Sequence, residues 1–144
     1  MKGPRTPAGV GFLACAALSF ACASAKREAA ELVAAVDRFH RAENADKPAR
    51  EKAIEAVVCA DEEVCEAKRL CEAATKDTAA GLLLKAEVER GLAALEKGSL
   101  QKTDPEAQAL SGKLDEAGRL LGEGHVRMPA CDDKILDLRR RYAL

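Results

Sequence analysis

A scarcity of residues that favour β-strands limits this chain to helical folds. Thirty of its 144 residues are alanine, whereas isoleucine occurs twice, tyrosine once and tryptophan not at all. Alanine has the highest intrinsic helix propensity, and β-branched and aromatic residues are those that strands prefer. Because alanine buries little apolar surface, an alanine-rich core of this size needs covalent reinforcement. The composition predicts an all-α fold stapled by disulfides.

Apolar side chains recur at helical spacing and predict a small bundle of five or six amphipathic helices. The first is expected over about 24–43 with Ser24 as its N-cap, and the second starts at Pro48 after a turn. Asp61 is a typical N-cap for the third helix. The segment from there to Gly98 is expected to break at 75–78, although one long helix also fits the pattern.

The clearest helix start in the sequence is Thr103-Asp104-Pro105, where capping residues precede a proline at the first helical position. Gly122 and Gly124 are expected to end that helix. Pro129 is then expected to open a short final helix. Residues 26–144 are predicted to form a single helical domain.

The first 25 residues have a composition of their own. Lys2 and Arg5 are their only charged residues, an apolar run extends from Val10 to Ala21, and small residues follow as far as Ala25. A charged start, a short apolar run and small residues at the end are the parts of a secretory signal. The run is shorter than the roughly 20 residues that a membrane-spanning helix needs. We therefore expect residues 1–25 to be a signal peptide and the protein to be exported.

Two cleavage sites are available in this segment. Ala23-Ser24-Ala25 has the A-x-A pattern that precedes a cut, here before Lys26. Leu18-Ser19-Phe20-Ala21-Cys22 resembles the lipobox of bacterial lipoproteins. The resemblance implies a cut before Cys22, a diacylglycerol on its thiol, and attachment to a membrane without a spanning helix. It also implies delivery to the outer membrane, because no aspartate follows the cysteine.

Four cysteines lie in the expected mature domain, and an even number in an exported chain indicates disulfides. They are Cys59, Cys65, Cys71 and Cys131. Residues six apart on one helix are separated by a rise of about 9 Å, beyond the roughly 7 Å that a disulfide allows. Cys59 and Cys65 can therefore pair only if the chain turns at 60–61. We expect this pair together with Cys71–Cys131, while the other two connectivities remain open.

No catalytic or metal-binding signature stands out. The same cysteines with His125 are the best candidate metal ligands, but five-residue gaps are not the spacing of structural zinc sites. Asp132-Asp133 lacks the spacing of a calcium-binding loop. His40 and His125 are the available near-neutral bases, and both are expected at the surface, His125 in a glycine-flanked loop. Because the chain has no nucleophile elbow and no phosphate-binding loop, we expect no enzyme activity and no cofactor.

These observations predict a class of protein rather than a specific activity. The 23 basic and 24 acidic residues are interspersed, with no basic patch of the kind that binds nucleic acid. We expect a non-catalytic structural or protein-interaction module of the cell envelope, lipid-anchored at Cys22 in the outer membrane or free in the periplasm, with an envelope protein as partner. The alternative is a small periplasmic metal-binding protein or enzyme that uses His125 with nearby cysteines or acids.

Overall fold

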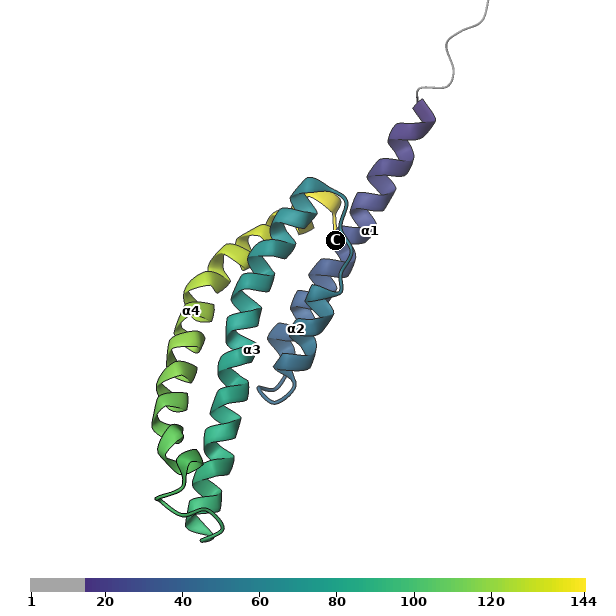
Figure 1. The fold of residues 1–144 in the computed structure, drawn as a ribbon. Coiled ribbons are helices and arrows are strands. Elements are labelled where there is room, and N and C mark those ends of the chain that lie inside the picture. Colours follow the sequence, from purple (N-terminus) through teal and green to yellow (C-terminus); the bar gives the residue numbers. More distant parts are fainter. Residues whose placement is uncertain (1–14) are drawn as a thin grey trace, which may run out of the picture.

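The computed structural model describes residues 15–144, with side chains from Ala23 onward. That part of the chain contains four helices and no strand: α1 (Cys15–Arg41), α2 (Lys47–Glu55), α3 (Glu62–Glu96) and α4 (Pro105–Tyr142). Helices α1 and α2 form a short hairpin, and α3 and α4 form a long one beside it (Figure 1). The all-α prediction is confirmed, but four helices replace the five or six expected.

The expected break at 75–78 is wrong, because α3 runs through it without interruption. Thr75 and Thr78 lie there and keep helical geometry. The Thr75 hydroxyl donates to the Cys71 carbonyl at 2.8 Å, and the Thr78 hydroxyl donates to the Ala74 carbonyl at 2.9 Å. A threonine bonded in this way to the preceding turn satisfies its hydroxyl inside the helix.

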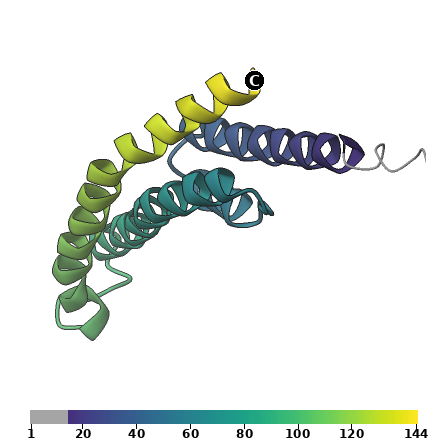
Figure 2. The same ribbon diagram turned by 90° about the horizontal axis from the view of Figure 1, so that it is seen from above.

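The expected division of α4 is also wrong. Gly122 and Gly124 do not end the helix, and Pro129 lies inside it. Because proline has no N–H, the carbonyl of His125 loses its partner in the next turn, a loss that bends helices. Helix α4 curves along its length, as Figure 2 shows. His125 therefore lies in a helix and not in the loop expected for it.

Three other helix ends follow the sequence signals, and the start of α1 does not. The Asp61 carboxylate accepts from the N–H groups of Glu63 and Val64, as an N-cap does. Helix α4 starts at Pro105. Gly98 follows the end of α3 with φ of 73°, in the left-handed region where glycine carries no steric penalty. Ser24 is not an N-cap, since α1 already begins at Cys15.

Helices α3 and α4 meet through residues spaced seven apart, the repeat of a coiled coil. The buried residues at this spacing are Leu110, Ala117, Gly124, Cys131 and Leu138 in α4, and Ala67, Ala74, Gly81 and Val88 in α3. Many of them are small, so the two helices pack closely. A Cβ atom on Gly124 would lie 2.9 Å from the Ala74 carbonyl oxygen, and one on Gly81 would lie 3.0 Å from the Ala117 carbonyl oxygen.

The α1–α2 hairpin covers only the half of the α3–α4 hairpin nearest the start of α3 (Figure 1). Phe39 of α1, Ile54 of α2 and Ile135 of α4 are buried in the core of this half. We call the remaining half, residues 81–96 of α3 and 105–121 of α4, the arm. No third helix of the described chain lies against the arm (Figures 1 and 2).

Candidate functional site at the N-terminal corner

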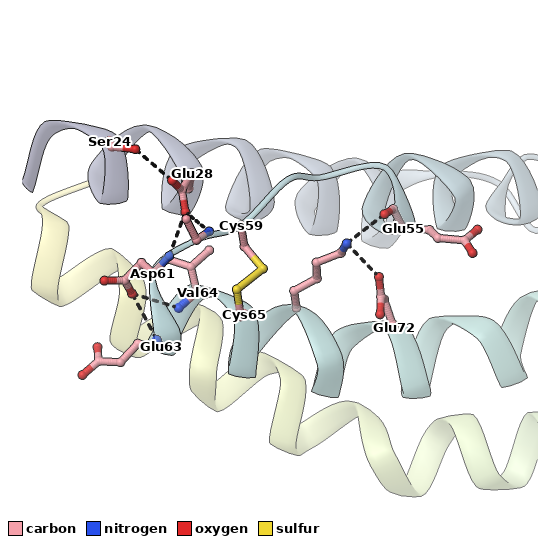
Figure 3. Close-up of a disulfide and its surroundings, with 11 residues drawn as sticks. Ser24, Glu28, Glu55, Cys59, Asp61, Glu63, Val64, Cys65 and Glu72 are labelled. Atoms are coloured by element: carbon pink, nitrogen blue, oxygen red, sulfur yellow. Dashed lines mark hydrogen bonds and ion pairs between the residues drawn. A yellow bond between two sulfur atoms is a disulfide. The ribbon is translucent and has the colours of Figure 1, made fainter. Parts of the chain in front are cut away.

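The early part of α1 is fastened to the start of α3 by a buried carboxylate. Glu28 is 8% exposed, and its Oε2 accepts from the N–H groups of Ala60 at 2.7 Å and Asp61 at 3.1 Å. Its other oxygen accepts from the Ser24 hydroxyl at 2.9 Å (Figure 3). The backbone N–H groups of Ala60 and Asp61, followed by the Ser24 hydroxyl, stabilise the carboxylate and lower the pKa of Glu28.

A disulfide closes the same corner. Cys59 and Cys65 are bonded with their Cα atoms 5.4 Å apart, on either side of the turn that precedes α3 (Figure 3). Helix α3 begins at Glu62, so the chain changes direction where this pair requires it. Nearby, Lys68 Nζ donates to the Glu55 carbonyl at 2.9 Å and ties α3 to the end of α2.

The second disulfide joins Cys71 of α3 to Cys131 of α4 in the interior. Both residues have no exposed surface, and their Cα atoms are 4.6 Å apart. The structure thus contains the two pairs expected from the sequence. Stable disulfides form in oxidising compartments, so they indicate an extracytoplasmic environment for this protein.

The packed domain begins upstream of Lys26. Ala25 is 8% exposed, and Ser24 is partly buried through its bond to Glu28. Both residues precede one of the two expected cleavage points and follow the other. The expected signal segment before them, together with the side chain of Cys22, lies outside the residues whose side chains are described.

The histidines and the acidic pair are only partly brought together. His40 Nε2, at the end of α1, lies 3.0 Å from Asp132 Oδ1 of α4, and the two side chains are 39% and 47% exposed. About two turns further along α4, Arg139 donates to both carboxylate oxygens of Asp37 at 2.6 and 2.7 Å. These contacts attach α1 to α4. His125 is exposed about two turns away from Asp132, and Asp133 is exposed as well.

The described residues contain no group of three or more histidine, cysteine or acidic side chains able to hold a metal ion. The four cysteines are bonded in pairs and offer no thiolate. A shallow groove of about 440 Å³ lies between α1 and α2, lined by four alanines together with Arg27, Glu31, Arg38 and Val57. Its lining contains no serine, cysteine or histidine.

Two leucines of the arm occupy positions that are buried elsewhere in the same helices. Leu92 follows Cys71 by three seven-residue repeats, and Leu114 precedes Met128 by two. Cys71 lies in the core and Met128 packs against it, whereas Leu92 is 48% exposed and Leu114 is 52% exposed. These two exposed leucines form what we call the uncovered face of the arm, although the charged and exposed Lys85 lies one repeat before Leu92. The sequence signal for this face is the seven-residue register shared by α3 and α4. The apolar pattern of each helix taken alone does not reveal it.

No protein family, curated protein or solved structure matches this chain. Within residues 15–144, no helix has the length and apolar character required to cross a bilayer.

Proposed function

We propose that this chain is an exported cell-envelope protein, attached to the outer membrane through a lipid on Cys22, that serves as a non-catalytic interaction module. The observation that carries the lipid anchor is the packing of Ser24 and Ala25 into the folded domain. The two disulfides support the extracytoplasmic location.

The two cleavage sites have different consequences for the fold. A cut before Lys26 removes the Ser24 hydroxyl that Glu28 accepts from, and it removes the buried Ala25. A cut before Cys22 retains both residues. Since a mature domain normally keeps the residues that it packs, the structure favours the lipobox-type cut over the A-x-A cut.

The uncovered face of the arm supports a protein partner. Leu92 and Leu114 are exposed, whereas the residues at the same register positions in the other half of the molecule, Cys71 and Met128, belong to the core or pack against it. A helix from another protein would continue the layer formed by α1 and bury both leucines. Such apolar anchors at helical spacing are a common mode of recognition between helices.

Metabolic labelling with a palmitate analogue tests the anchor. Wild-type protein produced from the full-length gene in a bacterial host is expected to incorporate the label, and Cys22→Ala is expected to lose it. Cys15→Ala is the matched control, because this cysteine also lies in the signal segment and should leave the labelling intact. Unlabelled wild-type protein, or labelling that survives Cys22→Ala, would contradict the proposal.

Photo-crosslinking in cells tests the interaction face. A photoreactive amino acid at Leu114 is expected to give a discrete adduct. The same group at Val126 is expected to give none. Val126 is 78% exposed on α4, but it follows the interface residue Gly124 by two positions, so it lies on the side of α4 that faces away from α3. Equal adducts at both positions, or none at Leu114, would refute a partner at this face.

A further inference from the structure

We propose that the end of the bundle formed by Ala25, the corner at 60–61 and the C-terminal Leu144 lies against the lipid surface, while the arm points away from the membrane. This inference rests on the lipid anchor at Cys22 proposed above. It adds a membrane-contact surface and an orientation that the anchor alone does not specify.

The tether between lipid and domain is very short. Ala23 and Ser24 alone separate Cys22 from Ala25, which is already buried in the domain. Three residues span at most about 10 Å even when fully extended. In the structure they are helical and continuous with α1, so their actual reach is shorter. The corner of the bundle is therefore held at the bilayer surface, with no room for a partner between the two.

The long axis of the molecule starts at this corner. Glu28 binds the N–H groups of residues 60 and 61, and α3 begins immediately afterwards. At a rise of about 1.5 Å per residue, the 35 residues of α3 extend about 50 Å to the loop at 97–104. Figure 1 shows the start of α3 and the C-terminus at one end of the bundle and this loop at the other. The anchored end and the loop are thus the two extremes of the molecule.

The surface of the anchored end is compatible with contact with lipid when the acyl chains on Cys22 hold the domain there. Leu144 is 42% exposed there and offers an apolar side chain to the lipid surface. The charges at this end are mixed, since Arg141 pairs with Glu63 and the Asp61 carboxylate caps α3. Because opposite charges lie side by side, attraction to anionic headgroups adds little, and high salt is expected to leave the bound orientation unchanged.

The absence of tryptophan from the chain allows single-tryptophan reporters. Full-length protein is purified in its acylated form and inserted into phosphatidylcholine vesicles that contain brominated lipid, a short-range quencher of tryptophan. Leu144→Trp is expected to lose much of its emission. Leu114→Trp, at a similarly exposed leucine in the arm, is expected to keep its emission. Ala60→Trp provides a second reporter at the corner and is expected to behave like Leu144→Trp.

Each outcome bears on the proposal. Equal quenching of the arm and corner reporters would show that the molecule lies flat, which overturns the orientation. Acylated protein in which neither corner reporter is quenched would show a domain held away from lipid, which also overturns it. The intact mass of the same preparation separates the two proposals, because a chain without acyl groups removes the anchor itself and the orientation with it.

Discussion

Close packing between α3 and α4 makes a specific prediction about two glycines of the same helix. Gly124 lies in the interface, and an added Cβ atom would meet the Thr78 hydroxyl, the Ala74 carbonyl oxygen at 2.9 Å and the Thr78 nitrogen at 3.0 Å. Two of these atoms belong to the backbone and cannot move aside cheaply. A Cβ atom on Gly118 would meet nothing within 4 Å.

The two alanine substitutions should therefore change the free energy of unfolding in opposite directions. Overpacking costs about 1–3 kcal/mol, and the contacts with backbone at Gly124 place the cost near the upper limit. Replacing a helical glycine by alanine stabilises the helix by about 1 kcal/mol, which offsets part of this cost, so Gly124→Ala should destabilise the domain by about 2 kcal/mol. Gly118→Ala should stabilise it by about 1 kcal/mol. At about 4 °C per kcal/mol for a domain of this size, the Tm of Gly124→Ala should fall by about 8 °C and that of Gly118→Ala should rise by about 4 °C.

Thermal unfolding of a soluble form spanning residues 23–144, followed by far-UV circular dichroism, measures both values. Urea midpoints of the same proteins provide a second estimate that does not depend on heating. A Gly124→Ala protein as stable as Gly118→Ala would refute the close approach of α3 and α4. A loss of stability in both variants would show that alanine is unfavourable throughout α4 and would remove the contrast.

Two further predictions concern the corner and the disulfides. Glu28→Gln should lower stability at pH 7 by about 1 kcal/mol, because an amide oxygen accepts a hydrogen bond more weakly than a carboxylate. The pKa of Glu28 is lowered from 4.5, so the carboxylate stabilises the fold above that value and loses this contribution as pH falls through the folded pKa. The difference in unfolding free energy between wild type and variant should therefore disappear in urea titrations at low pH. A difference that persists at low pH would contradict the charged contact. Removing Cys71–Cys131 should cost about 4 kcal/mol and removing Cys59–Cys65 about 2 kcal/mol, because the first closes a much longer loop. Paired alanine variants compared by calorimetry test this order, and a larger loss at the corner would reverse it.

Local signals in the sequence predicted the helical class and several helix ends. Asp61 and Pro105 mark helix starts through capping and backbone chemistry that depends on their immediate neighbours. The pairing of Cys59 with Cys65 followed in the same way, because a disulfide across six residues requires a turn between them.

The errors arose where tertiary packing outweighs local preference. Gly122, Gly124 and Pro129 read locally as a helix end and a new start, yet α4 continues through all three. The reason lies in the packing against α3. The long interface between α3 and α4 stabilises a continuous α4, and the close approach of the two helices requires a residue without Cβ at position 124. A glycine read alone indicates a helix end, and only its place in the seven-residue register of the partner helix identifies it as an interface residue.

The candidate site was predictable to a different degree. Cys22 and the four disulfide cysteines are visible in the sequence. The Glu28 contact joins residues more than thirty apart and has no local signature. The uncovered face of the arm likewise depends on where the α1–α2 hairpin ends against α3, which follows from the length of both hairpins and not from any motif.

The most direct test of the account is the intact mass of the protein from cell membranes, alkylated without prior reduction. We predict a chain that starts at Cys22 and carries acyl groups, with no alkyl group on Cys59, Cys65, Cys71 or Cys131. A soluble chain that starts at Lys26 with alkylated cysteines would contradict both the anchor and the disulfide framework.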